Sequence, residues 1–406
     1  MSERRAQVAS SQAVFNPLLP EFHANPYPFY RALREEDPVH ESPFGFWVCT
    51  RYDDAVMILR DPRFGREGIA NSMEARLGLT QDSSRSRDML FQDPPDHTRL
   101  RGLVSRAFTP RVVEVMRPHI QDIVDVLLDR VEGAHAMDVI EDLAYPLPVR
   151  VICEMLGVPA SDQDVFKTWS TDIARSLDAA ILPVESDAIP RGRDARLALA
   201  DYFRGLIAKR RKDPKADLLS ALIAAEEEGS KLSEGELVST CMLLLIAGHE
   251  TTVNLIGNGL LALLQHPDQM RTLRSDPTLI QTAVEELLRF DGPVQRTGRM
   301  TTAEVEIGGK RIPKDPIVVS AIGAANRDPK YFSDPDRLDI SRKENRHIAF
   351  GFGIHFCLGA PLARIEGQIA IGALMRRLPA LTLVSNTPEW RESSVLRGLK
   401  ALPVTF

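Results

Sequence analysis

Residues 350–359 read Phe-Gly-Phe-Gly-Ile-His-Phe-Cys-Leu-Gly, a glycine-rich loop that presents a single cysteine, Cys357. Glycines on both sides of this cysteine let the backbone turn tightly and come close to a flat group. Residues 360–378 follow with helical character, so the first amides of this helix are expected to point at the sulfur. A cysteine in that position has a lowered pKa and is a good ligand for a soft metal. Phe350, seven residues upstream, is placed to shield the sulfur from water.

A lone cysteine is more often a small buried hydrophobe than a ligand, so the spacing around it has to decide. The pattern Phe-x-x-Gly-x-x-x-Cys-x-Gly, completed by Leu362-Ala363-Arg364, resembles the haem-binding signature of the cytochrome P-450 family. That resemblance implies that Cys357 is the axial ligand of haem iron. Structural zinc is disfavoured, because such a site needs four N or S ligands and no second cysteine lies nearby. The remaining cysteines are scattered singly and are interpreted as buried packing thiols in a reducing compartment: Cys49, Cys153 and Cys241.

The whole chain has 406 residues, of which 44% are apolar, and no Gly/Ser linker, repeat or low-complexity tract divides it. We therefore expect one large domain over residues 1–406, with a polar and flexible N-terminus over residues 1–16. The net charge of −6 argues against nucleic acid as a partner. The longest apolar run, residues 241–247, is far shorter than the roughly 20 residues that span a bilayer. Together with the polar N-terminus, this predicts a cytoplasmic protein without a membrane anchor, similar to the soluble bacterial members of the family and expected to be a monomer.

Helical periodicity predominates along the chain, and residues 112–131 carry a broad apolar stripe that predicts one core helix. Strand-like segments are fewer: residues 46–49, 304–307, 311–312, 381–384 and 402–406. The Gly308-Gly309 pair between two of them is a hairpin signal. The fold class expected from the residues is mainly α with small β-sheets. The resemblance implies a single triangular haem-thiolate domain wrapped around buried haem.

Two regions are rich in residues typical of loops, residues 65–93 and residues 177–193. They are either ordinary surface connections or lids over a pocket. The resemblance favours the second interpretation, because the corresponding segments form the mobile roof of the substrate pocket in the family.

A long helix is predicted to begin at the capping box Ser233-x-x-Glu236 and to continue until Pro267, over roughly 50 Å at 1.5 Å per residue. Residues 247–252, Ala-Gly-His-Glu-Thr-Thr, interrupt its apolar centre. A buried carboxylate costs several kcal/mol unless it is partnered, so the interruption indicates either a functional motif or a helix kink. A threonine here can also bond back to a carbonyl one turn earlier, which opens a notch in the helix.

The resemblance assigns roles within this motif. In the family an acid and an alcohol handle dioxygen and supply the protons that split the O–O bond, and the matching positions are Glu250 and Thr251. Ala247 and Gly248 match the positions that leave room for the cofactor. Thr252 is expected to pack behind the alcohol, and His249 is interpreted as a solvated or a satisfied histidine and not as a catalyst. The two neighbours are therefore not assigned to the reaction.

Glu286 and Arg289 form an i,i+3 pair, which by itself is common on solvated helices and contributes only a few tenths of a kcal/mol. Its place between the long helix and the cysteine loop, with Arg337 further on, is similar to the family's Glu-Arg-Arg network. The resemblance implies that Glu286, Arg289 and Arg337 form a structural brace for the cysteine loop. An arginine fork suits that task better than lysine.

Haem carries two propionates and needs cations at its edge. His97 and Arg101 lie at i,i+4 on one helix face and are placed to share a propionate. The resemblance adds Arg299 and His355 to this set, although each residue alone would be interpreted as a solvated charge. The loop positions Phe350, Gly351 and Gly359 complete the cofactor-binding residues.

The resemblance implies a monooxygenase that inserts one atom of O2 into a C–H bond, with haem b as cofactor. Electrons would come from NAD(P)H through a separate ferredoxin and its reductase. A basic patch is predicted to steer this acidic carrier, unless it is an ordinary solvated face: Arg99, Arg106, Arg346, His347 and Arg364.

The residues expected to line the substrate pocket are mainly apolar: Leu244, Pro293, Val294, Gln295, Val395 and Leu396. Such a lining suits a medium to large hydrophobic molecule, and the pattern is similar to hydroxylases of polyketide macrolides, terpenoids, steroids or fatty acids. Two rivals remain, a peroxide-driven peroxygenase and a haem-thiolate binding or recruitment protein. Both typically lack parts of the Cys357, Glu250 and Thr251 set that this chain retains.

Overall fold

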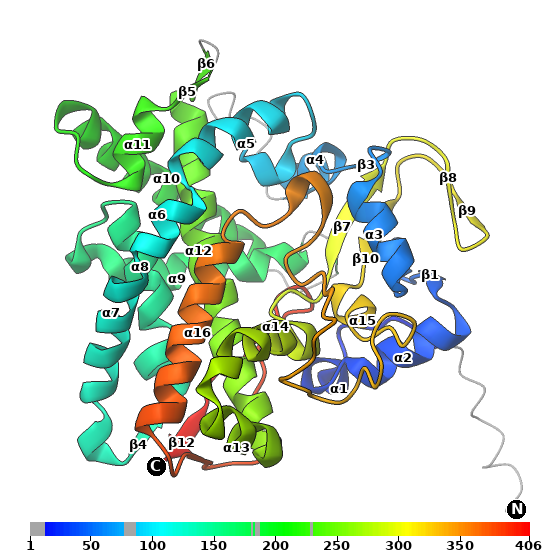
Figure 1. The fold of residues 1–406 in the computed structure, drawn as a ribbon. Coiled ribbons are helices and arrows are strands. Elements are labelled where there is room, and N and C mark those ends of the chain that lie inside the picture. The colour runs from blue at the N-terminus through cyan, green and yellow to red at the C-terminus, as the bar shows by residue number, and fades with distance from the viewer. Residues whose placement is uncertain (1–12, 77–86, 180–181, 183–186, 228–229) are drawn as a thin grey trace, which may run out of the picture.

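Helices form most of the described chain, as the periodicity of the apolar residues predicts (Figure 1). In this computed structural model the described residues are 13–76, 87–179, 182, 187–227 and 230–406. The helices are α1 (Pro20–Ala24), α2 (Tyr27–Glu36), α3 (Tyr52–Arg60), α4 (Glu67–Arg76), α5 (Asp96–Ala107), α6 (Pro110–Val115), α7 (Arg117–Asp129), α8 (Pro146–Met155), α9 (Gln163–Ala179), α10 (Ala188–Lys212), α11 (Leu218–Ala224), α12 (Glu234–Gln265), α13 (Pro267–Ser275), α14 (Ile280–Asp291), α15 (Ile322–Ala325) and α16 (Ala360–Arg377). The strands are β1 (Val39–Glu41), β2 (Trp47–Cys49), β3 (Phe64–Gly65), β4 (Ala136–Asp138), β5 (Glu226–Glu227), β6 (Ser230–Lys231), β7 (Thr297–Thr301), β8 (Val305–Ile307), β9 (Lys310–Ile312), β10 (Ile317–Ser320), β11 (Thr382–Leu383) and β12 (Pro403–Thr405). The expected class, mainly α with small sheets in a single domain, is confirmed.

Helix α12 forms the centre of the helical half of the molecule and begins where the sequence predicts. Its capping box is complete, because Glu236 N donates to Ser233 Oγ (3.3 Å) and Ser233 N donates to Glu236 Oε2 (2.8 Å). The helix has 32 residues and packs against α8, α10, α14 and α16. Figure 1 shows α16 lying across α12 on the side that faces the viewer. No described helix has both the length and the apolar content needed to cross a bilayer.

The strands gather mainly on the opposite side of the molecule from α7 and α8 (Figure 1). The largest sheet has the order β1-β2-β10-β7-β3, in which β2 and β10 run parallel and the other neighbours run antiparallel. Strands β8 and β9 form the predicted hairpin, turned by Gly308 and Gly309 with positive φ of 57° and 80°. Strands β11, β12 and β4 form a separate sheet near the C-terminus. The predicted strand segments are confirmed, whereas several two- to four-residue strands are too short to show a period in the sequence.

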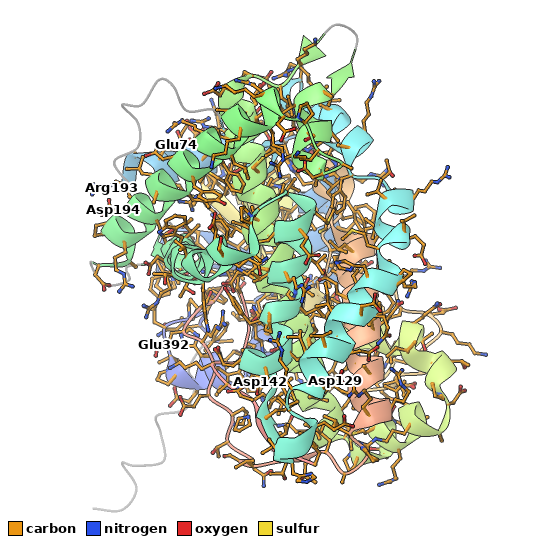
Figure 2. All side chains as sticks on the ribbon, turned by 90° about the vertical axis from the view of Figure 1, so that its left-hand side faces the viewer. Glu74, Asp129, Asp142, Arg193, Asp194 and Glu392 are labelled. Atoms are coloured by element: carbon orange, nitrogen blue, oxygen red, sulfur yellow. The ribbon has the colours of Figure 1, made fainter. Side chains whose placement is uncertain are left out.

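The N-terminal prediction needs a correction. Residues 1–12 lie outside the described residues, but Phe15 is only 1% exposed and contacts the rings of Phe22 and Phe46 at 5.4 and 6.0 Å. The ordered fold therefore begins before the expected boundary at residue 16, because an aromatic side chain within the polar tail is buried. Acidic side chains lie at the surface, as the net negative charge leads one to expect; Asp194 and Glu392 are two exposed examples (Figure 2).

The single helix predicted over residues 112–131 is wrong, since the chain forms α6 and α7 with a turn at Met116. Pro118 has no backbone N–H and its ring would clash with the carbonyl four residues earlier, so one continuous helix is excluded. The loop-rich prediction for residues 65–93 is wrong in part, because α4 forms there. In the second loop-rich region α9 continues to Ala179 and α10 begins at Ala188. The rest of both regions, residues 77–86, 180–181 and 183–186, falls outside the described residues.

Candidate active site

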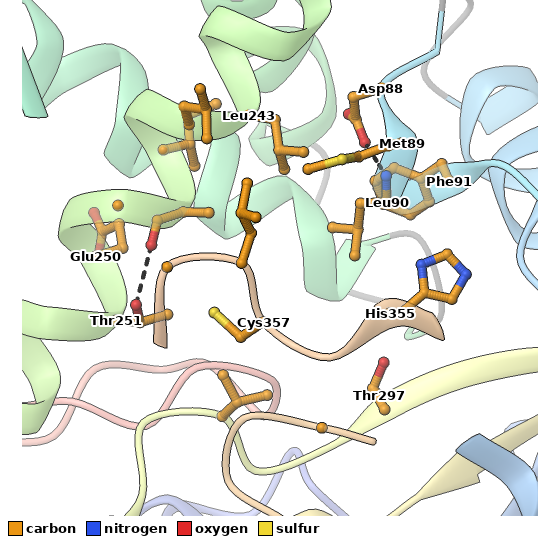
Figure 3. Close-up of a pocket in the computed structure, with 18 of the residues that line it drawn as sticks. Asp88, Met89, Leu90, Phe91, Leu243, Glu250, Thr251, Thr297, His355 and Cys357 are labelled. Carbon is orange, nitrogen blue, oxygen red and sulfur yellow. Dashed lines mark hydrogen bonds between the residues drawn. The ribbon is translucent and has the colours of Figure 1, made fainter. Parts of the chain in front are cut away.

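The cysteine loop holds Cys357 in a fixed position at the start of α16. Cys357 N donates to Phe350 O at 2.9 Å, which closes the loop on itself. Gly351 and Gly353 have φ of +74° and +72°, a conformation that side chains other than glycine rarely adopt. A Cβ at Gly353 would also lie 2.5 Å from Leu59 O, so this glycine allows the loop to pack against α3. The sulfur faces the cavity above the loop (Figure 3).

The expected lowering of the Cys357 pKa is not found. Burial raises the pKa of this thiol, although the backbone amides of Gly359 and Ala360 and the guanidinium of Arg101 act in the opposite direction. The helix N-terminus therefore does contribute as predicted, but the many protein atoms packed around the sulfur outweigh it, even though the thiol is exposed to the open cavity. Binding of a metal requires the thiolate, so ligation would remove the proton that burial retains.

A cavity of about 760 Å³ lies above Cys357 and brings most of the predicted site residues together. It is bounded by α12, the cysteine loop, the segment before β7 and the turn before β12 (Figure 3). The predicted residues that line it are His97, Arg101, Leu244, Ala247, Gly248, Glu250, Thr251, Pro293, Val294, Arg299, Phe350, Gly351, His355, Cys357, Gly359, Val395 and Leu396. Residues separated by up to 299 positions in the sequence thus share one chamber.

Gln295 is the predicted pocket residue that the structure places elsewhere. Its amide nitrogen donates to Gly292 O (2.9 Å) and to the Tyr27 hydroxyl (3.3 Å), and its side chain is buried outside the cavity. The segment is extended here and Val294 pairs with Leu396, so successive side chains point to opposite sides. Val294 and Arg296 line the cavity, and Gln295 between them cannot.

Cationic side chains gather at the edge of the cavity. The rings of His97 and His355 lie 4.2 Å apart, and the guanidinium of Arg101 donates to Phe356 O at 2.6 Å. Arg299 donates to Gly298 O (2.9 Å) and Thr297 Oγ1 (3.2 Å). No side-chain carboxylate among the described residues forms an ion pair with either arginine.

Arg66 completes this cluster, and the sequence analysis did not predict it as a site residue. It is 8% exposed, and its guanidinium donates to Leu90 O, Thr297 Oγ1 and Gly298 O at 2.9 to 3.2 Å. Burial lowers its pKa to about 10, and burial together with Arg66 lowers the pKa of Arg299 well below its usual range. Burial and the neighbouring arginines lower the pKa of His355 to about 2. No local signal marks Arg66, because it stands in a loop-rich segment without a motif.

The residues present fit haem. Both ring nitrogens of His97 are buried without a hydrogen-bond partner. Within the described part of the chain, Arg66, Arg101 and Arg299 form no direct ion pair with a carboxylate, although Asp93 lies near enough to act on the pKa values of Arg66 and Arg299. Burial of unpaired cations is costly unless an anion joins them, and the two propionates of haem would supply it. Residues of α12 and of the cysteine loop line the same cavity, and the thiol of Cys357 is among them, which suits a porphyrin with a thiolate-ligated iron.

The polar motif in α12 has the predicted local geometry. Thr251 Oγ1 donates to Ala247 O at 3.0 Å, one turn earlier (Figure 3). Glu250 is 5% exposed, and its Oε2 accepts a hydrogen bond from Arg391 Nη1 at 2.9 Å. His249 is buried and its Nδ1 lies 2.6 Å from Leu245 O, whereas its Nε2 is buried without a hydrogen-bond partner, so this histidine is not solvated and is satisfied at one ring nitrogen only. Helix α12 continues through the motif without a break, which disfavours the kink as its purpose.

Glu286 and Arg289 form the predicted buried pair, but the third member of the network is different. Arg289 Nε and Nη2 donate to the two oxygens of Glu286 at 2.7 and 2.8 Å, and both side chains are 0% exposed. Arg342 Nε, not Arg337, provides the second guanidinium on Glu286, at 3.1 Å. Arg337 is exposed and takes part through its carbonyl, which accepts from Arg289 Nη2. The residue nearer in sequence to the Asp-Pro-Asp turn is therefore not the one whose side chain turns inward.

The predicted basic patch is largely neutralised. Arg364 Nε and Nη2 donate hydrogen bonds to Glu285 Oε1 and Oε2 at 2.7 and 2.8 Å, and His347 Nε2 lies 3.1 Å from Glu285 Oε2. These partners outweigh burial and lower the pKa of Glu285 to about 2. Arg99 is paired with Glu236, whereas Arg346 is exposed. The patch is therefore less positive than its sequence suggests.

Comparison with known proteins agrees with this site. The family model described as Cytochrome P450 matches residues 63–397. The chain is 43% identical to the polyketide biosynthesis cytochrome P450 PksS of Bacillus subtilis, over 97% of this chain and 98% of that protein. It is 45% identical to the vitamin D(3) 25-hydroxylase of Pseudonocardia autotrophica, over 95% and 94% of the two chains. The crystal structure of myxobacterial cytochrome P450 CYP267B1 in complex with myristic acid has a TM-score of 0.88 and 44% identity, covering 96% of this chain and 98% of that one. The chain therefore belongs to the cytochrome P450 family, and thereby to the oxidoreductases that incorporate oxygen from O2.

Proposed function

We propose that this protein is a haem-thiolate monooxygenase that hydroxylates a medium to large hydrophobic molecule. The observation that carries the proposal is the common cavity, which is lined by Cys357, by Glu250 and Thr251, and by His97, Arg66, Arg101, Arg299 and His355 as its cationic or titratable group. The overall reaction balances as substrate C–H plus O2, two electrons and two protons, giving the alcohol and water. When bound, haem b supplies an iron whose thiolate ligand favours O–O cleavage.

Each protein group has a defined task in this proposal. Cys357 would ligate the iron, and the propionates would be held by His97, Arg101, Arg299, His355 and Arg66. Ala247 and Gly248 leave open space on the α12 side, and Phe350, Gly351 and Gly359 line the side of the sulfur. Thr251 and Glu250 position protons at the cavity wall. The Glu286, Arg289 and Arg342 cluster braces the segment that leads into the cysteine loop.

The experiment that tests the proposal is the carbon monoxide difference spectrum of the reduced holoprotein. Thiolate ligation shifts the Soret band to the long wavelength that distinguishes this family from histidine-ligated haem proteins. A band in the globin-like position, or a protein that does not bind haem at all, contradicts the proposal. Product formation from a bound substrate, with dioxygen and electrons supplied, is the second requirement.

The substrate is proposed to be hydrophobic because the cavity above Cys357 is lined mainly by apolar side chains. Leu244, Val294, Val395 and Leu396 are joined there by residues of α4 and α12 such as Met73 and Leu243. The names of the relatives span a polyketide pathway, vitamin D(3) and myristic acid, so they support hydrophobicity without selecting a class. Titration of polyketide, steroid, terpenoid and fatty-acid panels against the ferric holoprotein should give a low- to high-spin shift with its true substrate class.

The electron donors are proposed to be a ferredoxin and its NAD(P)H-dependent reductase, acting on a monomer in the cytoplasm. The exposed Arg346 lies on the segment that enters the cysteine loop, and its carbonyl is held by the Tyr52 hydroxyl at 2.6 Å. An acidic carrier would be attracted to such a cation over a distance set by the ionic strength. Reduction rates that fall as salt rises would support this assignment.

Replacing Thr251 with alanine should uncouple electron use from product formation. The substitution removes the hydroxyl that now donates to Ala247 O, and with it the group placed to hold a proton at the cavity wall. We expect the product formed per NAD(P)H consumed to fall by about tenfold or more, with hydrogen peroxide in its place. Thr251→Ser keeps the hydroxyl and should stay close to wild type. Unchanged coupling in the alanine variant would contradict the role of Thr251.

A further inference from the structure

Arg391 lies outside every motif, yet its side chain contacts the buried acid of α12. Arg391 Nη1 donates to Glu250 Oε2 at 2.9 Å, and Arg391 Nε donates to Leu399 O at 3.2 Å. The side chain of Glu250 is 6% exposed, whereas that of Arg391 is 31% exposed. Arg391 therefore reaches from the solvent to the carboxylate and is held in place at both ends of its guanidinium.

The contact is built into the packing of α12 and is not an accident of one side chain. Glu250, Asn254 and Asn258 are spaced by four residues and share one face of the helix. Asn258 Nδ2 donates to Arg397 O at 3.0 Å, and a Cβ at Gly398 would lie 1.8 Å from Asn254 Oδ1. Three successive turns of α12 thus meet residues 391–398.

The segment itself is folded so that Arg391 faces the helix. Arg391 N donates to Gly398 O at 2.9 Å, and Trp390 pairs with Leu399. Gly398 is needed at this point because any side chain would displace Asn254. The close approach of backbone and helix fixes where the guanidinium of Arg391 can reach.

The other charged or titratable neighbours of Glu250 do not replace Arg391. His249 Nε2 lies 3.8 Å from Glu250 Oε1, but burial lowers the pKa of this histidine and its Nδ1 bonds to Leu245 O. His249 is therefore neutral near pH 7, with Nδ1 protonated and Nε2 bare. Tyr145, on the far side, packs edge-on against the His249 ring at 6.1 Å. Among the described residues, Arg391 is the fully charged cation that forms an ion pair with Glu250.

We propose that Arg391 is a positioning residue for Glu250, which orients the carboxylate toward the surface and controls its exchange of protons with solvent during oxygen activation. The inference rests on the proposed monooxygenase function and adds a residue that the family motifs do not contain. In the proposed function, Glu250 receives a proton from solvent and passes it toward Thr251. Arg391 fixes the carboxylate so that one of its oxygens, Oε2, lies against the partly exposed guanidinium. The other oxygen remains on the side of His249 and the helix interior.

The first test compares Arg391→Gln, Arg391→Lys and Lys400→Gln in the reconstituted holoenzyme. Arg391→Gln should lower the product formed per NAD(P)H by about tenfold and raise the solvent deuterium isotope effect, because proton supply becomes limiting. Arg391→Lys keeps a cation and should restore a large part of the coupling. Lys400→Gln removes a positive charge from the same segment, where Lys400 faces Glu392 at 3.6 Å, and should behave as wild type.

The second test needs no turnover. A double-mutant cycle of Arg391→Gln with Glu250→Gln is measured as the midpoint of thermal unfolding of the ferric protein. Arg391→Gln should lower the midpoint by about 2 °C when Glu250 is present and leave it almost unchanged in the Glu250→Gln background. An interaction that was merely structural would move this midpoint without changing the isotope effect.

Two results would overturn the inference. One is an Arg391→Gln enzyme with the coupling and isotope effect of the Lys400→Gln control. The other is a cycle in which the two substitutions act additively. Both differ from failure of the proposed function, which would appear in every variant, wild type included, as a missing thiolate band in the carbon monoxide spectrum.

Discussion

Replacement of Cys357 with alanine should reduce product formation to the level of a reaction without enzyme. The sulfur is the proposed iron ligand, because it lines the cavity and the hydrogen bond from Cys357 N to Phe350 O fixes the loop that carries it. The cations at the cavity edge remain, so the variant should still bind some haem. Its reduced carbon monoxide complex should lose the long-wavelength Soret band, which difference spectroscopy measures directly.

The chain offers a matched control in Cys241, a thiol on α12 that is 0% exposed. Burial raises its pKa to about 12, so it stays protonated and packs as a small apolar group. Cys241→Ala should keep the thiolate spectrum and lose only a modest amount of stability. A Cys357→Ala protein with an unchanged band, or a Cys241→Ala protein without it, would contradict the assignment of the ligand.

Replacement of Glu286 with glutamine should destabilise the protein by about 3–5 kcal/mol, because it leaves the fully buried Arg289 without a counter-charge. The carboxylate also accepts from Arg342 Nε, Asn345 Nδ2 and the backbone of Asp339 at 2.9 to 3.1 Å. We expect the unfolding midpoint to fall by about 5 °C in a chain of this length. Because these partners precede the cysteine loop, haem content per protein should fall as well.

Arg337→Gln is the control for this network, because the Arg337 side chain does not contact Glu286. Arg342→Gln is the matched test, because Arg342 does. Arg337 contributes only a carbonyl, which glutamine retains, so the unfolding midpoint should stay within about 1 °C of wild type. Arg342→Gln removes a guanidinium from Glu286 and should give a drop between those of the other two variants. If Arg337→Gln were the more harmful of the two arginine variants, the observed geometry of the brace would be contradicted.

Features that depend on neighbours in the sequence were predictable. The capping box at Ser233, the back-bond from Thr251 to Ala247 and the Glu286–Arg289 pair all join residues within one helical turn. Their geometry follows from 3.6 residues per turn, whatever the rest of the fold does. The cysteine loop is local too, and the family to which it led is confirmed by the family model and by the solved structures.

Features that depend on contacts between distant segments could not be predicted from the sequence. Arg342 and Arg337 are chemically identical in the sequence, and only the path of the chain around α14 turns one guanidinium onto Glu286. Gln295 stands among apolar pocket residues, yet the alternation of an extended segment points it away from the cavity. In the same way, Arg66 becomes a cavity cation because β3 and α4 place it against β7.

The sequence by itself determined the helical class, the family and the start of the central helix, and it supplied the proposals for the iron ligand and for the acid and alcohol, because each rests on residues close together along the chain. The tertiary structure alone decided which charges face one another: Arg342 on Glu286, Arg391 on Glu250, and Arg66 beside Arg299. The physical reason is that the free energy of a charge depends on its burial and its partners, and both are properties of the folded space around it.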